Sequence, residues 1–510
     1  MTVLTAETLG QLDAGVSLPR YDRRDVRTGI VHIGVGNFHR SHQAMYIDTL
    51  MNNGAAMDWG ICGIGLQPSN TRIRDALAAQ DGLYTLVLRH SDGSWDARVI
   101  GSIVEFLFAP DDPEAAIEKI AAPATRIVSL TITEGGYNLD DVTGEFISSD
   151  PSVAADLQPG AVPRTVFGIV TEALARRRDR GIPAFAILSC DNIPGNGHVS
   201  QRAFTAFARL RDPGLAGWMT RHVRFPNCMV DRITPQTTDT DRAELSRRFG
   251  LDDQWPVLSE PFTQWVLEDD FADGRPPLED AGVQIVSDVG PYELMKLRLL
   301  NASHQALCYA GYLVGYRLVH EVTTDPLFAR FLLDYMTQEA IPTLRPVPGV
   351  DLHHYAHQLI ERFSNPEVGD TLARLCTDGS DRIPKFLLPV IRQQLAGGRP
   401  FTRSAAVVAS WARYAEGTDE NGAPHEINDD LAPRLQAAAR RQRGHRTAFL
   451  EGNRAVFGEL AGDPRFTAVY SPILTALLEH GVRATFTNLD HYAAPSMAGH
   501  KPAGIERKSP

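Results

Sequence analysis

The chain has 510 residues, 43% of them hydrophobic and 22% charged, which is typical of a globular protein of two to four domains. Its 50 basic and 62 acidic residues give a dispersed net charge of −12, which offers no footprint for nucleic acid or an anionic membrane. No signal peptide and no apolar run of roughly 18 residues is visible, so we expect a cytoplasmic protein. The five scattered cysteines argue against disulfides and against a metal site.

The first half of the chain alternates short β-branched runs with helical patterns, which predicts a parallel sheet covered by helices. In chain order, the candidate strands are residues 29–35, 59–66, 126–133, 183–190 and 225–230, with helices at 113–120 and 165–178. Long helical patterns dominate later, at 293–313, 327–339 and 404–414. We therefore expect an α/β domain over 1–285 and a mostly α-helical domain over 286–510, with a loosely held polar tail from about Gly499.

The first strand runs into a glycine turn that is typical of dinucleotide binding. The strand ends at Gly34-x-Gly36, and a helix is expected to begin at about His39, which stands where the usual fingerprint has a third glycine. Glycines let the backbone approach a pyrophosphate, and a helix N-terminus supplies N–H donors. An ordinary tight turn would show the same glycines. We expect a Rossmann-type domain whose cofactor is bound by Gly34, Gly36, Asn37 and Phe38.

The second strand should supply the group that contacts the adenosine ribose, usually an acid roughly 20 residues past the glycines in NAD enzymes. Here the strand runs into Gln67-Pro68-Ser69-Asn70-Thr71-Arg72, with no acid before Asp75. Ser69 and Asn70 are the candidate ribose contacts. Arg72 could meet a 2′-phosphate or be an ordinary surface charge. The predicted cofactor is NAD, and NADP stays open.

A helix that begins near Pro291 is apolar on nearly all sides, so we expect it to be buried. Lys296, Asn301 and His304 interrupt it within an arc of roughly 140° at α-helical spacing, and can converge on one cavity. A desolvated lysine has a lowered pKa and can accept a proton from an alcohol, an amide can stabilise an alkoxide, and a histidine can orient a hydroxyl. Taken singly, each could equally be an ordinary structural residue.

Three polar residues follow the predicted strands, where parallel sheets bind ligands. Asn192 follows strand 183–190 and is a second amide candidate. Glu134 follows strand 126–133 and could relay protons between Lys296 and solvent. Asp231 follows strand 225–230. Glu134 and Asp231 could also be simple turn or capping residues.

Five segments resemble the polyol-specific long-chain dehydrogenases, also called the mannitol dehydrogenase family: GxGxFHRxHQA from Gly34, QDGLYTL from Gln80, TEGGY from Thr133, SCDNxPxNG from Ser189 and KLRLLNxxH from Lys296. The resemblance implies metal-independent hydride transfer between NAD(H) and a polyol/ketose pair, here D-mannitol and D-fructose. It further implies that the protein is a monomer, with a dimer as the alternative. By the same resemblance Lys296 is the general base, Asn192 and Asn301 stabilise the oxyanion, His304 positions the substrate and Glu134 gates proton transfer.

The segment from Arg374 to Phe386 resembles the family's DGSxK substrate stretch, with Arg382 where a lysine is common. Arg374 and Arg382, together with Asp231 at the end of its strand, are the predicted substrate contacts. Arg374, Arg382 or Lys385 could instead bind the carboxylate of a keto-uronate. A fructuronate reductase and an arabinitol dehydrogenase are the alternatives within the family. A non-catalytic dinucleotide-binding sensor is the alternative from another class, although such a sensor should have lost the base.

Overall fold

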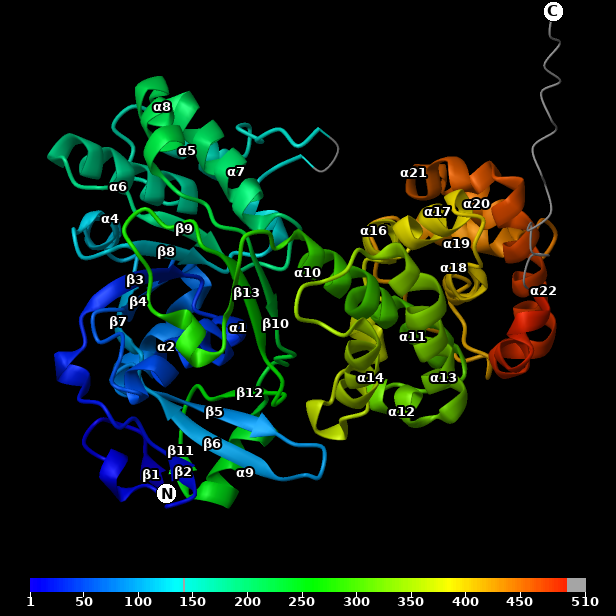
Figure 1. Ribbon diagram of the computed structural model, residues 1–510, viewed down its shortest axis with the longest axis horizontal. Coiled ribbons are helices and arrows are strands. Elements are labelled where there is room, and N and C mark those ends of the chain that lie inside the picture. The colour runs from blue at the N-terminus through cyan, green and yellow to red at the C-terminus, as the bar shows by residue number, and fades with distance from the viewer. Residues whose placement is uncertain (141–142, 493–510) are drawn as a thin grey trace, which may run out of the picture. The chain divides into compact units, whose positions relative to one another are not determined.

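The computed structural model describes residues 1–140 and 143–492, and the chain divides after Gly290 into two compact units (Figure 1). The first unit is α/β and the second is helical. The polar tail expected from about Gly499 lies outside the described residues.

A five-stranded parallel sheet forms the centre of the first unit, in the order β7-β4-β3-β8-β9. The strands are Thr28–Ile33 (β3), Gly60–Gly65 (β4), Ile103–Phe108 (β7), Ile127–Leu130 (β8) and Ala186–Ser189 (β9). β3 comes first along the chain yet lies in the middle, with Val31 opposite both Cys62 and Val128. The chain therefore winds from β3 in both directions, and the order reverses between β3 and β8, where sheets of this type bind ligands.

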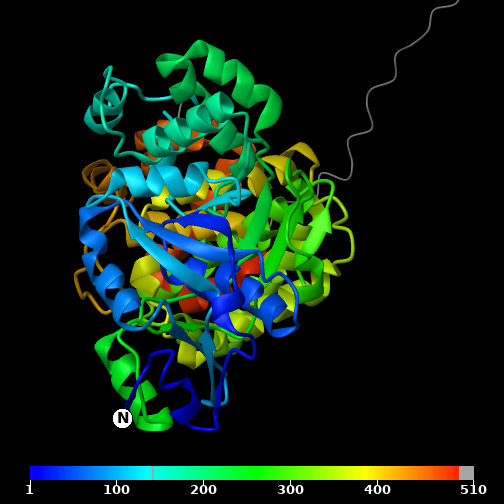
Figure 2. The same cartoon turned by 90° about the vertical axis from the view of Figure 1, so that its left-hand side faces the viewer.

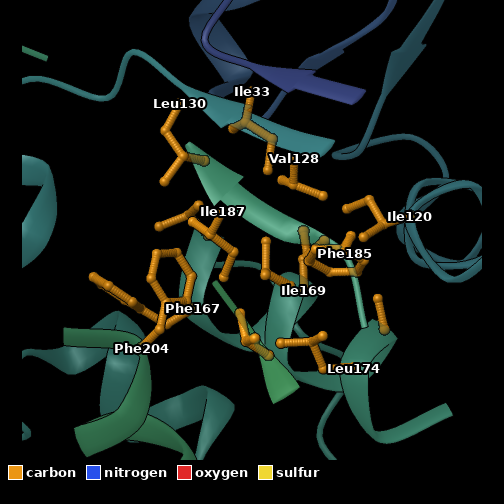
Figure 3. Close-up of a cluster of buried hydrophobic side chains, with 14 of the residues drawn as sticks. Ile33, Ile120, Val128, Leu130, Phe167, Ile169, Leu174, Phe185, Ile187 and Phe204 are labelled. Carbon is orange, nitrogen blue, oxygen red and sulfur yellow. The ribbon is translucent and has the colours of Figure 1, made fainter. Parts of the chain in front are cut away.

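Helices cover both faces of this sheet because its strands are apolar on both sides. Val128, Leu130 and Ile187 pack in one core with residues of α4 (Pro113–Ala121), α6 (Val166–Arg180) and α7 (Asn196–Arg211) (Figure 3). Ile127 and Leu188 belong to the opposite core, together with residues of α2 (Gln43–Asn52) and α3 (Thr71–Ala79). Each fully buried aliphatic or aromatic side chain contributes about 1.5–3 kcal/mol, so the two cores fix the sheet firmly.

Three smaller sheets complete the first unit, in the orders β12-β5-β6-β2, β10-β13-β14 and β1-β11. Their strands are Thr2–Val3 (β1), Val16–Ser17 (β2), Tyr84–Arg89 (β5), Trp95–Ile100 (β6), Cys228–Asp231 (β10), Leu251–Asp252 (β11), Val257–Ser259 (β12), Gln264–Glu268 (β13) and Gln284–Val286 (β14). The remaining helices of this unit are Asn37–Ser41 (α1), Pro151–Asp156 (α5), Pro213–His222 (α8) and Asp239–Phe249 (α9). Figure 2 shows the N-terminal segment beside α9, where β1 pairs with β11.

The expected assignment of segment 225–230 to the parallel sheet is wrong. This segment forms β10, which pairs antiparallel with β13, Cys228 lying opposite Leu267. An isolated bridge from Ala186 to Arg224 connects its beginning to β9. All four residues of β10 are buried, and a short buried run does not reveal its partner or its direction.

The second unit contains helices Gly290–Met295 (α10), Ala302–Leu313 (α11), Val319–Thr324 (α12), Pro326–Asp334 (α13), Leu352–Phe363 (α14), Leu372–Leu375 (α15), Gly379–Phe386 (α16), Leu388–Ala396 (α17), Thr402–Tyr414 (α18), Ala432–Arg441 (α19), Ala448–Gly452 (α20), Arg454–Phe457 (α21) and Pro464–Thr487 (α22). Every residue of α18 is buried, and this helix packs on α11 and α22. The buried Glu339 carboxylate accepts the backbone N–H groups of Arg403 and Ser404 at 2.7 and 2.8 Å, which caps α18. In the described part of the chain, no helix combines the length and apolarity needed to cross a bilayer.

Candidate functional site

The turn after β3 can exist only with glycine at its first position. Gly34 has φ +96°, and a Cβ there would lie 2.2 Å from the Thr131 carbonyl oxygen at the end of β8. Beside Gly36 the space is open: among the described residues, the nearest atom to an added Cβ is the Gly34 carbonyl oxygen, at 3.8 Å. Backbone at this turn can therefore approach a ligand closely, at the reversal point of the sheet.

Helix α1 begins at Asn37, before the start expected at about His39, and a break at His42 separates it from α2. The Asn37 side chain is held inside the protein, donating to the Pro235 carbonyl at 3.2 Å and accepting from Arg40 at 2.7 Å. Phe38 stacks on His42, with ring centroids 4.9 Å apart. These side chains therefore make contacts within the protein that support the turn.

Two stacked histidines lie beneath the turn, a feature that the sequence reasoning missed. The rings of His32 and His39 are parallel, with centroids 3.4 Å apart, and His32 Nδ1 lies 2.8 Å from Ser129 Oγ. Burial lowers the pKa of His32 to about 3 and that of His39 well below its ordinary value. Both are therefore neutral at pH 7, and the only sequence signal was His39 in place of the third glycine.

The segment after β4 carries the predicted ribose contacts. Ser69 is exposed and Asn70 half-buried, and Asn70 Oδ1 accepts the Gln67 N–H at 3.0 Å. Exposed Arg72 lies over the Trp255 ring, 4.8 Å from its centroid. Arg72 and Trp255 border a pocket of about 590 Å³. The charged residues that line it are Arg72, Arg242, Asp75, Asp252 and Asp253. Carboxylates outnumber guanidinium groups there, so the pocket as a whole does not favour an extra phosphate.

The loops after β8 and β9 are tied together by Asp191. Its carboxylate accepts the N–H groups of Ile132 at 3.1 Å and Thr133 at 2.9 Å, and the Tyr137 hydroxyl at 2.6 Å. Burial raises the pKa of Asp191 although these three bonds oppose the shift. Glu134, which directly follows Thr133, and Asn192, which follows Asp191, are thereby brought to the same edge of the sheet. Asp231 ends β10, which pairs antiparallel with β13 in a separate three-stranded mixed sheet, and is buried.

In the second unit, Lys296–Asn301 forms a π-helical turn, here called the first π-turn, which joins α10 and α11. The expected α-helical spacing is therefore wrong in this segment. Five α-helical steps would rotate Asn301 about 140° away from Lys296. Hydrogen bonds from residue i to i+5 widen the turn and so bring the two residues closer to one face than α-helical spacing would. Both are buried, and His304 follows Asn301 by one α-helical turn, its ring 4.9 Å from that of Phe363.

The first π-turn is held by contacts that the sequence did not reveal. The Tyr335 hydroxyl, from a second π-turn at Tyr335–Ala340, donates to the Arg298 carbonyl at 3.0 Å. The Arg298 guanidinium donates to the Thr343 carbonyl at 2.6 Å and to Gln393 at 3.0 Å. The Tyr335 hydroxyl therefore bonds the backbone of the π-turn directly, and the Arg298 side chain ties the turn to two neighbouring segments.

The two predicted substrate cations have partners inside the second unit. Arg374 forms a two-point ion pair with Asp370, at 2.7 and 2.6 Å, which raises the pKa of Arg374. Arg382 Nη1 lies 3.4 Å from the carbonyl oxygens of Arg374 and Leu375, at the end of α15.

The five cysteines are buried free thiols, and the described residues contain no group of three His, Cys, Asp or Glu side chains able to hold a metal.

Comparison with known proteins covers both units. Residues 28–280 match the mannitol dehydrogenase Rossmann domain, and residues 288–477 match the mannitol dehydrogenase C-terminal domain. The mannitol 2-dehydrogenase of Aspergillus fumigatus is 46% identical over 493 residues, covering 94% of this chain and 98% of the relative.

Two solved structures are similar along nearly their whole length. Mannitol 2-dehydrogenase of Pseudomonas fluorescens, solved as a ternary complex with NAD and D-mannitol, is 47% identical, with a TM-score of 0.85 over 96% of this chain and 100% of that one. D-sorbitol dehydrogenase in substrate-free form is 39% identical, with a TM-score of 0.84 over 95% of this chain and 100% of that one. The chain therefore belongs to the mannitol dehydrogenase family and has the α/β Rossmann-type domain and helical domain that its sequence predicts.

Proposed function

We propose that this protein oxidises D-mannitol to D-fructose with NAD and catalyses the reverse reduction. The observation that carries the proposal is 47% identity over the full length of an enzyme solved with NAD and D-mannitol. The residues needed for the chemistry are also present here: Lys296, Asn301 and His304 on one helix, and Asn192 at the edge of the sheet. A non-catalytic sensor would have no need of the lysine.

The turn after β3 fits a dinucleotide. The open space beside Gly36 and the close approach at Gly34 are features that a pyrophosphate requires. Bound NAD would supply the hydride acceptor, and Ser69 and Asn70 would contact its ribose. The surplus of carboxylates in the pocket near Arg72 supports NAD over NADP.

The assigned roles follow from the chemistry of each side chain. Lys296, buried within an apolar helix, takes the proton from the oxygen of the reacting hydroxyl. The hydride leaves the carbon that bears this hydroxyl. The amides of Asn192 and Asn301 donate to the developing alkoxide without changing their own charge. His304 orients the hydroxyl by a hydrogen bond. Glu134 passes the proton to solvent, and Asp231 contacts the sugar.

A neutral polyol suits the second unit better than a keto-uronate does. A uronate needs an available cation, whereas Arg374 is held by both oxygens of Asp370 and Lys385 pairs with Asp381. We retain Arg382 as a donor to substrate hydroxyls and assign Arg374 a supporting part beside it. D-sorbitol deserves testing because a D-sorbitol dehydrogenase is 39% identical.

The test is the initial rate of absorbance change at the reduced nicotinamide band. Purified protein is given mannitol, sorbitol, arabinitol, fructose and fructuronate, each with NAD(H) and with NADP(H). The highest kcat/KM for mannitol and fructose with NAD(H) would support the proposal. Turnover with fructuronate alone would contradict it and make the arginines carboxylate ligands. Cofactor binding without turnover of any pair would favour the sensor.

The cofactor preference has its own variant. Arg72→Ala should leave kcat/KM for NAD within about twofold, because Arg72 is exposed and its guanidinium lies over the Trp255 ring. A large selective loss with NADP would instead assign Arg72 to a 2′-phosphate.

We also propose that the protein acts as a monomer. Light scattering should therefore give a mass near 56.0 kDa, and twice that mass would contradict the proposal.

A further inference from the structure

Thr133 has a backbone conformation that threonine rarely adopts. It combines φ +68° with ψ 167°, a region populated almost only by glycine. Asn138 and Asp378, by contrast, have positive φ in the left-handed helical region, which their residue types tolerate. A β-branched side chain makes the conformation at Thr133 still less favourable, so something must hold it there.

The Asp191 carboxylate is the group in contact with this peptide. One of its oxygens accepts the Thr133 N–H at 2.9 Å, and the other accepts the Ile132 N–H at 3.1 Å. The second oxygen also accepts the Tyr137 hydroxyl, whose oxygen lies 2.6 Å from Ser189 Oγ as well. The carboxylate thus binds both ends of the segment that contains Thr133 and Glu134. It is buried, 8% exposed, so water competes little for these bonds.

We propose that Asp191 is a positioning residue, whose carboxylate holds Thr133 in its strained conformation and so fixes the direction in which the chain enters Glu134. This inference rests on the proposed function, because it matters for turnover only if Glu134 passes protons. Since Asp191 also directly precedes Asn192, it adjoins the second predicted catalytic residue of the first unit as well as fixing the chain that enters Glu134.

Replacing the carboxylate should release the strain. Asp191→Asn turns one acceptor oxygen into an N–H donor that faces a backbone N–H. One of the two hydrogen bonds from the backbone amides of Ile132 and Thr133 is therefore lost. Thr133 would then relax to an ordinary conformation and displace Glu134. Strain of this kind biases the backbone by about five- to a hundredfold, so glycine at this position should retain the required conformation far more often than threonine.

The experiment is a double-mutant cycle of Asp191→Asn and Thr133→Gly in the full-length protein. Asp191→Asn should lower kcat for mannitol at least tenfold with NAD affinity nearly unchanged, and should displace the pH dependence of kcat. Thr133→Gly alone should leave kcat within about threefold. In the double variant, Thr133→Gly should restore at least a third of the lost turnover. If Asp191→Asn lowered kcat by the same factor in the Thr133→Gly variant as in the parent protein, the proposal would be overturned.

Asp156→Asn is the matched control. Asp156 is also a buried carboxylate of the first unit, and it accepts the N–H groups of Arg164 and Thr165 at 3.0 and 2.8 Å at the start of α6. Its replacement should lower the melting temperature as much as Asp191→Asn does and leave kcat unchanged. If both variants lost turnover in proportion to stability, Asp191 would be purely structural and the proposal would fail.

Hydrogen exchange separates this proposal from the proposed function. The amides of Ile132 and Thr133 should exchange at least tenfold faster in Asp191→Asn than in the parent protein, whatever the substrate. If the parent protein turned over no polyol, the proposed function would fail, and faster exchange would still support the clamp on Thr133. Unchanged exchange in Asp191→Asn would overturn the clamp even in an active enzyme.

Discussion

At the scale of single residues, Lys296 carries the strongest prediction about chemistry. Lys296→Ala should lower kcat by about 10²–10⁴-fold, because proton removal from the alcohol loses its base. Binding of NAD, measured by fluorescence titration, should change little, because Lys296 lies outside the glycine turn. Lys119→Ala is the control, since Lys119 forms a surface ion pair with Glu105 and should be dispensable. Wild-type turnover in Lys296→Ala would remove Lys296 from the role of base.

The stacked histidines predict a pH dependence of stability. The pKa of His32 is about 3 in the folded protein and about 6.5 in an unfolded chain, so the unfolded chain binds the extra proton between these values. The contribution of His32 to the free energy of unfolding is therefore fully present above pH 6.5 and is lost as the pH falls towards 3. His32→Gln should remove about 2 kcal/mol of the loss between pH 7.5 and 5.0. Thermal unfolding at both pH values tests this.

Exposed His480 provides the control for that measurement. His480→Gln should leave the pH dependence of unfolding as it is in the parent protein, because the His480 side chain is exposed on the surface and lies outside the buried core. If His32→Gln and the parent protein lost stability equally on acidification, His32 would not be a buried neutral histidine.

At the scale of secondary-structure elements, the first π-turn is the feature on which the catalytic helix depends. Tyr335→Phe removes the hydroxyl that donates to the Arg298 carbonyl, and the loss of one such hydrogen bond costs about 0.5–1.5 kcal/mol. If the turn then relaxes towards α-helical spacing, Lys296 and Asn301 separate by about 140°. We expect kcat to fall about tenfold or more, together with the melting temperature.

Tyr470→Phe tests whether that effect is specific. Tyr470 is buried in α22, and its hydroxyl has no hydrogen-bond partner among the described residues. Its loss should leave both stability and kcat nearly unchanged. Equal turnover in Tyr335→Phe and Tyr470→Phe would show that the π-turn persists without the Tyr335 hydroxyl.

At the scale of the whole molecule, we expect turnover to be independent of added metal. In the proposed mechanism Lys296 is the base, and amides rather than a Lewis acid stabilise the alkoxide. Exhaustive dialysis against a chelator should leave kcat within error of the untreated enzyme, with a zinc-dependent alcohol dehydrogenase treated in parallel as the positive control. Complete loss of activity, restored by a divalent cation, would contradict the proposed mechanism.

The sequence alone determined the α/β and helical halves, the glycine turn after β3 and the family, because these depend on local patterns. Alternating or continuous apolar runs indicate the elements, and the pair Gly34 and Gly36 after an apolar run marks the turn. The candidate site residues could likewise be named from the sequence, because buried polar side chains in an apolar helix or at strand ends are visible there.

Only the tertiary structure decided how those residues are held. The first π-turn depends on a hydroxyl 37 residues away, and the Asp191 contact with Thr133 joins residues 58 positions apart. The pairing of Arg374 with Asp370, four residues before it, and the antiparallel partner of β10 were equally hidden. Periodicity reports which side of an element is apolar. It does not report which polar group on another segment satisfies a strained or unpaired backbone, because that depends on packing.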